Sequence, residues 1–268
     1  MRVTIASVRL ICFALLLLFG LAIAFTLRIS AGRTWYSQPF GAATKLYWMR
    51  MAAWILGLRL QKFGVLPEKG AIWVANHISW LDAVALSTLS PVSFIAKSDV
   101  RKWPIVGQLA ALSGTLFIDR SARRAVSISI TEAREVLNTG ISVAFFPEAT
   151  TTDGHRLHPF KPALFATANA DTRVQAITLR YQPSHDGSEN APFIGNDTFI
   201  AHLWRVLRTP RGIRLELIFC PAIVSADRKL LAQQTQKQIR EVLEVHTQWS
   251  IEQKTAMIAA HAASEFGQ

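Results

Sequence analysis

Residues 71–76 read AIWVAN, a short apolar run that follows Pro67 and Gly70 and leads directly into NHISWLD at residues 76–82. An apolar run of this length, bounded by turn-forming residues, predicts a strand that is buried on both faces of a sheet. Comparable runs lie at residues 92–96, 114–118, 141–146, 174–180 and 215–220, the last followed by Pro221, and helical patterns lie at residues 82–89, 103–112 and 122–138. This alternation predicts an α/β fold, with a central, mostly buried sheet flanked by helices.

The length of 268 residues suits one large domain or two small ones, and half of the residues are hydrophobic. That hydrophobic content excludes a disordered chain. Two cysteines, Cys12 and Cys220, are too few for a disulfide framework or a Cys-rich zinc module. We expect three regions: membrane-anchoring helices over residues 1–65, an α/β domain over residues 66–225 and a C-terminal helical tail over residues 226–268.

The most hydrophobic segment lies near the N-terminus. Residues 10–27 (LICFALLLLFGLAIAFTL) carry no charge and are bracketed by Arg9 and Arg28. At 1.5 Å per residue they form about 27 Å of helix, close to the thickness of a bilayer's hydrocarbon core. We therefore predict a membrane anchor; the alternative is a secretory signal cleaved near residues 22–24. Residues 47–60 carry tryptophans and arginines that favour a helix at the membrane interface, with a buried core helix as the alternative.

The positive charge is concentrated in the same region. Eight of the 29 lysines and arginines precede the first acid, Glu68, and the remaining 21 nearly balance the 18 acids. Cations beside an apolar helix favour an anionic membrane surface as partner, at roughly 1 kcal/mol per cation. A nucleic-acid-binding protein is expected to carry its charge on a folded polar surface instead.

The first candidate for chemistry is the pair His77 and Asp82 in NHISWLD. A spacing of five residues separates two side chains by about 140° on a continuous helix, so they meet only where a strand gives way to a helix. Asp82 could then hold the imidazole tautomer whose second nitrogen accepts a proton. This is the base-and-orienter part of a triad, with the nucleophile left to the substrate. The alternative is a helix capping box formed by Ser79 and Asp82.

Two further polar clusters follow predicted strands. FIDR ends in Arg120, and FFPEATT at residues 145–151 contains Glu148. Both clusters lie at the carboxyl ends of strands, where open α/β sheets bind their ligands. No GxGxxG, P-loop, HExxH or GxSxG motif is present, so dinucleotide binding, NTP hydrolysis, zinc-protease chemistry and α/β-hydrolase chemistry lack sequence support.

The order NHISWLD, FIDR, FPEATT resembles the glycerolipid (lysophospholipid) acyltransferases, the His-x4-Asp acyltransferases, over roughly residues 66–185. The resemblance implies transfer of a fatty acyl group from acyl-carrier protein or acyl-CoA to a lysolipid hydroxyl, with no metal or redox cofactor. It implies that His77 takes the hydroxyl proton, that Asp82 orients His77, and that Arg120, Glu148 and Thr150 position the acceptor. It also implies a bacterial-type inner-membrane protein with its catalytic domain on the cytoplasmic side. An inactive membrane-anchored scaffold and a hydrolase are the competing classes.

The sequence departs from the family pattern at the third and fourth blocks. Ala149 and Thr151 replace the usual glycine and arginine, and Ala176, in VQAITL at residues 174–179, replaces the usual proline. An arginine at this place in the family helps to hold an acceptor phosphate, which a threonine cannot do. Residues 148–165 resemble the lyso-ornithine lipid acyltransferase branch, whose acceptor lacks a phosphate. Lyso-ornithine lipid is therefore the expected acceptor; the alternative is lysophosphatidate, with Arg120, Arg156 or Lys161 as its clamp.

Two other clusters can be interpreted either as solvated surface side chains or as binding sites. The residues Asp153, His155 and His158 could hold a metal, although solvated loop side chains are the favoured interpretation. Arginines recur every third residue at Arg205, Arg208, Arg211 and Arg214. A solvated face is favoured, and a patch for anionic lipid or for an acidic carrier protein is the alternative.

Overall fold

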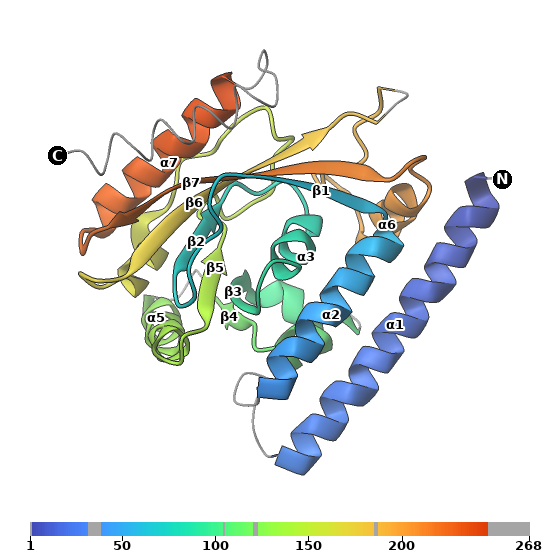
Figure 1. Cartoon of the computed structure of the whole chain (residues 1–268), viewed down its shortest axis with the longest axis horizontal. Coiled ribbons are helices and arrows are strands. Elements are labelled where there is room, and N and C mark those ends of the chain that lie inside the picture. The colour runs from blue at the N-terminus through green and yellow to red at the C-terminus, as the bar shows by residue number, and fades with distance from the viewer. Residues whose placement is uncertain (1, 32–38, 104, 120–122, 185–186, 246–268) are drawn as a thin grey trace.

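The computed structural model describes residues 2–31, 39–103, 105–119, 123–184 and 187–245 (Figure 1). Its centre is a seven-stranded sheet with the order β1-β7-β6-β2-β5-β3-β4. The strands are β1 (Leu58–Phe63), β2 (Ile72–Ala75), β3 (Val92–Lys97), β4 (Leu116–Ile118), β5 (Ser142–Phe145), β6 (Arg173–Gln182) and β7 (Ile213–Val224). The α/β fold expected from the sequence, with its central sheet, is confirmed.

Strand direction brings several segments to one edge of the sheet. β2 pairs in parallel with β5 and β6, and β3 pairs in parallel with β5 and β4. β7 runs antiparallel to β6, and β1 runs parallel to β7. The carboxyl ends of β2 to β6 therefore meet at the edge where β7 and β1 begin.

Helices cover both faces of the sheet, as Figure 1 shows. Those in the described residues are α1 (Arg2–Ala31), α2 (Pro39–Leu56), α3 (Leu81–Ser87), α4 (Val106–Leu112), α5 (Arg123–Asn138), α6 (Phe199–Leu207) and α7 (Arg228–Val245), together with the short 3₁₀ helices η2 (Ser98–Lys102) and η3 (Pro162–Thr167). One apolar core joins the sheet to α5, α7 and η3, and another joins its opposite face to α3. A third cluster joins α1, α2, α3 and α6.

The two N-terminal helices lie side by side (Figure 1) and are joined by the indole of Trp48, which donates to the carbonyl oxygen of Leu16 over 3.1 Å. Residues Val3–Ile23 of α1 are long and apolar enough to cross a membrane, by length and composition, and 22% of the tested window is buried against the protein. Cys12 is exposed on this helix. The apolar N-terminal helix expected from the sequence is therefore present as a candidate anchor.

The end of the anchor region differs from expectation. The helix predicted over residues 47–60 ends at Leu56, and the chain continues as edge strand β1. The sheet thus starts at Leu58, upstream of the domain start expected at residue 66. Gly57 makes the change of direction possible because its φ of 77° is left-handed.

Pro221 does not end the last strand, which runs from Ile213 to Val224. The pairing of β6 with β7 shifts register between Gln175 and Ile177, opposite this proline, and β1 stops pairing at Ile218. A proline is tolerated where a bulge and a free strand edge remove the need for its missing N–H.

The remaining differences are local. The helix expected over residues 103–112 is the α4 helix from Val106, preceded by η2, and α6 was not expected. The helix predicted over residues 82–89 and the strands predicted over residues 92–96, 141–146 and 174–180 are confirmed within a few residues.

Candidate active site

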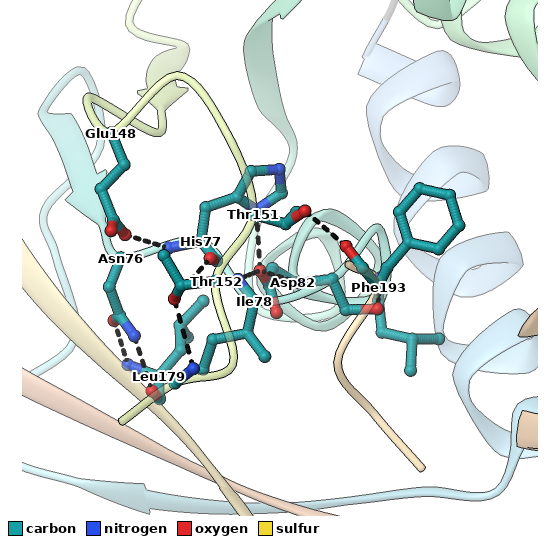
Figure 2. Close-up of polar contacts among 12 residues, drawn as sticks. Asn76, His77, Ile78, Asp82, Glu148, Thr151, Thr152, Leu179 and Phe193 are labelled. Atoms are coloured by element: carbon teal, nitrogen blue, oxygen red, sulfur yellow. Dashed lines mark hydrogen bonds and ion pairs between the residues drawn. The ribbon is translucent and has the colours of Figure 1, made fainter. Parts of the chain in front are cut away.

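The predicted pair lies together at the carboxyl end of β2. His77 Nδ1 lies 2.8 Å from Asp82 Oδ2, although five residues separate them (Figure 2). The strand-to-helix change makes the contact possible: His77 lies on the turn after β2, and Asp82 is the second residue of α3. The geometry on which the general-base hypothesis depends is therefore present, while the catalytic roles remain predictions.

Asp82 is completely buried, and four donors satisfy its carboxylate. Oδ2 accepts from His77 and from the backbone N–H groups of Ile78 at 2.7 Å and Ser79 at 2.9 Å. Oδ1 accepts the hydroxyl proton of Tyr181 at 2.7 Å. Of the predicted capping box only one half is present: Asp82 accepts from the Ser79 N–H, while the N-cap of α3 is Trp80 and has no side-chain cap. The same carboxylate contacts His77, and its orienting role in catalysis stays a prediction.

The proton on His77 can be placed from these contacts. A buried carboxylate with four donors around it is an acceptor, so Nδ1 carries the hydrogen and Nε2 is left with its lone pair. The imidazole stacks on Phe146 with ring centroids 4.0 Å apart, and the side chain is 21% exposed. A partly exposed imidazole whose Nε2 lies outside the hydrogen bonds of the described residues is suited to accept a proton from a substrate.

Glu148 lies beneath the turn and holds it in place. Its Oε1 accepts from the backbone N–H of His77 at 2.7 Å, and its Oε2 accepts from that of His158 at 2.8 Å (Figure 2 shows the first). Burial raises the pKa of Glu148, and these two hydrogen bonds oppose that effect. Because both oxygens are engaged and the residue is 3% exposed, the geometry supports a positioning role. The predicted contact of Glu148 with the acceptor stays a prediction.

The segment after Glu148 crosses the turn and is tied to it. Thr152 donates its N–H to the His77 carbonyl oxygen over 2.8 Å, and the hydroxyl of Thr151 donates to the carbonyl oxygen of Phe193. Thr150 is exposed to solvent, and its contact with the acceptor stays a prediction. Ala149 adopts a left-handed φ of 66°, the conformation for which the family's usual glycine is suited.

An aromatic wall borders the site on the side of α6. The backbone N–H of Phe193 donates to the Ile78 carbonyl oxygen over 2.9 Å, and Trp80 Nε1 donates to His202 Nδ1 over 2.9 Å. The proton of His202 therefore lies on Nε2, which contacts the carbonyl oxygens of Ala191 and Pro192 at 3.1 Å each. Burial lowers the pKa of His202, consistent with a neutral, structural imidazole.

The structure bears differently on the three remaining predictions, namely Arg120, the metal cluster and the arginine series. Arg120 lies outside the described residues. His155 Nε2 lies 3.1 Å from a carboxylate oxygen of Glu189, and among the described residues no cluster of histidine, cysteine or acidic side chains is placed to hold a metal ion. Arg205 pairs with Asp197 at 2.7 Å, and the solvated face and the binding patch both stay predictions for the arginine series.

Two residues of the site were missed in the sequence. Asn76 donates Nδ2 to the Leu179 carbonyl oxygen over 2.9 Å, and its Oδ1 accepts from the Leu179 N–H over 2.8 Å (Figure 2). Tyr181 contacts Asp82 from the same strand, β6. Asn76 could have been suspected as a polar residue ending an apolar strand, whereas Tyr181 carried no local signal.

The His–Asp pair lies on the turn that follows parallel strand β2, and Glu148, which follows the neighbouring strand β5, accepts from the backbone of that turn. The family model described as Acyltransferase matches residues 59–180, and the chain belongs to this family. The family resemblance read from the sequence is confirmed.

Two relatives and one solved structure are similar to most of the chain. The chain is 37% identical over 199 residues to the lyso-ornithine lipid O-acyltransferase of Pseudomonas aeruginosa, covering 74% of this chain and 77% of that protein. It is 35% identical over 196 residues to the 1-acyl-sn-glycerol-3-phosphate acyltransferase of Neisseria meningitidis, covering 72% and 77%. The crystal structure of the acyltransferase PlsC from Thermotoga maritima shares the fold, with a TM-score of 0.50 and 18% identity over 90% of this chain and 99% of that one.

Proposed function

We propose that this acyltransferase moves a fatty acyl group from a thioester donor to the free hydroxyl of lyso-ornithine lipid, giving ornithine lipid. The observation that carries the proposal is the contact of 2.8 Å between His77 Nδ1 and Asp82 Oδ2, which leaves Nε2 free to act as a base. Acyl-carrier protein or CoA carries the acyl group, and the reaction needs no metal or redox cofactor.

The reaction follows from the position of that base. His77 Nε2 takes the hydroxyl proton as the acceptor oxygen attacks the thioester carbonyl carbon. An ester C–O bond forms, the C–S bond breaks, and the proton passes from Nε2 to the departing thiolate. Asp82 stabilises the imidazolium between these two transfers. General-base catalysis of this kind contributes about 10²–10⁴-fold to the rate.

The third sequence block supports an acceptor without a phosphate. At the place of the family's phosphate-binding arginine stands Thr151, whose hydroxyl donates to the carbonyl oxygen of Phe193. A neutral side chain engaged with the backbone offers a phosphate dianion neither charge nor a bidentate fork. An acceptor without a phosphomonoester suits this arrangement, and the similarity to the Pseudomonas aeruginosa protein supports the same choice.

Lysophosphatidate is the second candidate, because the Neisseria meningitidis relative named for that acceptor is almost as similar, at 35% identity. Purified protein given a labelled acyl donor and either acceptor distinguishes the two. We expect labelled ornithine lipid, with at least a tenfold higher kcat/KM for lyso-ornithine lipid. Preference for lysophosphatidate would reject our choice of acceptor, release of free fatty acid would indicate a hydrolase, and neither product would indicate a scaffold.

A variant tests the reason given for the acceptor. Thr151→Arg restores the cation that the block usually carries, so transfer to lysophosphatidate should rise relative to transfer to lyso-ornithine lipid. Ser127→Arg adds the same charge at an exposed position on α5, to which no role in acceptor binding is assigned, and serves as the control. An unchanged acceptor ratio in Thr151→Arg would remove this residue from the explanation.

We also propose that the protein acts at the cytoplasmic face of a bacterial inner membrane, where thioester donors are made. The apolar surface of α1 and the cations of the N-terminal region support attachment to an anionic bilayer.

A further inference from the structure

Strand β6 extends beyond its neighbour β2 and rises beside the catalytic turn. The last residue pair between them is Ala75 with Ile177, but β6 continues to Gln182. The Asn76 side chain takes the place of the next ladder residue by pairing with both backbone groups of Leu179. These two hydrogen bonds fix the position of β6 along its own axis relative to the turn that carries His77.

Tyr181 lies two residues beyond Leu179, so its side chain points to the same face of β6. Its hydroxyl donates to Asp82 Oδ1 over 2.7 Å, on the oxygen that His77 does not use. Burial, and then the charge of Asp82, raises the pKa of Tyr181 well above its usual value. The phenol therefore keeps its proton and remains a donor throughout the working pH range.

We propose that Tyr181 is a positioning residue of the acyl-transfer site, completing a buried relay of Tyr181, Asp82 and His77. The inference rests on the proposed function and deepens it. The phenol fixes the rotation of the carboxylate, so that Oδ2 points at His77 Nδ1. It also takes up negative charge on Oδ1, which the interior would otherwise leave without a partner.

The alternative is that Tyr181 only fills space, since its ring packs against the two apolar clusters that include residues of α3. The two roles differ in what they predict for the removal of one oxygen atom. A packing role depends on the ring, which phenylalanine retains. A positioning role depends on the hydroxyl, which phenylalanine lacks.

Titratable groups on three elements around the relay have contacts of their own, and further charged side chains, Asp153, His155, Glu189, Arg240 and Glu244, line the pocket that Tyr181 borders. Glu148, from the segment after β5, is engaged by two backbone N–H groups. Glu216, on β7, lies 3.5 Å from Arg180, and these two residues belong to the neighbouring register pair of β6 and β7. His202, on α6, contacts Trp80 and two carbonyl oxygens. Because none of these contacts is changed by the loss of the phenol, a shift in the pH profile reports on the relay.

The test compares Tyr181→Phe with Tyr47→Phe, which removes the same hydroxyl from an exposed site on α2. Full-length proteins are assayed with labelled thioester and the acceptor that the wild type uses. We expect Tyr181→Phe to lower kcat about tenfold, the effect of one lost hydrogen bond to a charged group, with KM values within twofold. The acid limb of its kcat/KM profile should move to higher pH, because a less neutralised Asp82 holds the imidazolium more tightly.

A double-mutant cycle makes the inference specific. In an Asp82→Asn background, Tyr181→Phe should cost nothing further, because the phenol acts through the carboxylate. Equal kinetics and pH profiles for Tyr181→Phe and Tyr47→Phe, or additive losses in the cycle, would overturn the relay. Failure of the proposed function looks different, since the wild type and Tyr47→Phe would then both give no labelled diacyl lipid.

Discussion

At the scale of single residues, the catalytic turn is held by backbone groups that a sequence motif does not display. Glu148 accepts from the N–H groups of His77 and His158, which lie in separate segments. One buried carboxylate thus fixes the residue that carries the base to the loop that follows β5. Glu148 therefore fixes the shape of the site through these two hydrogen bonds, and their contribution can be measured.

Glu148→Gln tests this function with a side chain of nearly the same size. The amide has one oxygen, so one backbone N–H must face an NH₂ group and loses its acceptor. An unsatisfied buried donor costs about 1–3 kcal/mol of unfolding free energy. We expect denaturant unfolding to report that loss, with a lower kcat. Glu135→Gln on α5, where the side chain is exposed, is the control and should leave both values unchanged.

Ala149 pays a conformational cost that glycine would avoid. A left-handed φ costs an L-residue about 1–2 kcal/mol, and the greater freedom of glycine in the unfolded chain offsets roughly 0.5–1 kcal/mol of that. Ala149→Gly should therefore stabilise the protein by up to about 1 kcal/mol, seen as a higher Tm. The same change at Ala201 in α6, where the backbone is right-handed, should lower the Tm. A lower Tm for both variants would contradict the strain argument.

The sequence identified His77 and Asp82 because their roles depend on a short spacing and a strand-to-helix break. It could not identify Tyr181, which reaches Asp82 across 99 positions through the pairing of β6 with β2. Long-range pairing decides such contacts, and no local pattern records it.

At the scale of elements, a buried lysine fastens helix α2 to the sheet. Lys45 Nζ donates to the carbonyl oxygens of Val92 at 2.8 Å and Ser113 at 3.0 Å, at the beginning of β3 and after α4. Burial lowers the pKa of Lys45 from 10.5 to about 7. Between these two values the unfolded chain binds a proton that the folded chain does not.

Stability should therefore rise as pH increases from about 7 to about 10.5, since the unfolded state binds more protons over that range. Denaturant unfolding in detergent at several pH values measures the slope. Lys45→Met removes the titrating group and should flatten it, whereas Lys62→Met, at an exposed site on β1, should not. Equal slopes for wild type and Lys45→Met would show that this amine does not titrate on folding.

Element boundaries were predictable where local signals act alone. The turn-forming residues before β2 and the helical spacing of α5 gave the right elements. β1 was missed because Leu58 and Leu60 extend the apolar pattern of the helix before it. Only the pairing with β7 makes this segment a strand. Pro221 indicated a strand end because the register shift that accommodates it appears only when β7 is paired with β6.

At the scale of the whole molecule, the apolar surface is concentrated on α1, on the opposite side of the sheet from α5 and α7. Leu15 and Phe19 are more than half exposed there. The α/β class followed from the alternation of strand and helix patterns and the candidate anchor helix from hydropathy, and both signals average over many residues. The docking of α1 on α6 and α4 did not, because it depends on side chains from distant segments.

Paired substitution Leu15→Glu and Phe19→Glu should move the protein from the membrane fraction to the soluble one. Each carboxylate placed in the bilayer core costs about 2–3 kcal/mol of insertion free energy, so two of them strongly disfavour insertion of α1. Sedimentation with anionic vesicles gives the partition. Ile128→Glu, on the exposed side of α5, is the control and should leave binding intact. Retained vesicle binding by the double variant would locate the anchor elsewhere.

The most direct test of the central claim is the rate of labelled acyl transfer to lyso-ornithine lipid by His77→Ala, beside wild type. If the imidazole is the general base, the turnover number should fall by about 10²–10⁴-fold while vesicle binding and the unfolding midpoint stay near wild type. Transfer at the wild-type rate by a folded, membrane-bound His77→Ala protein would contradict the account.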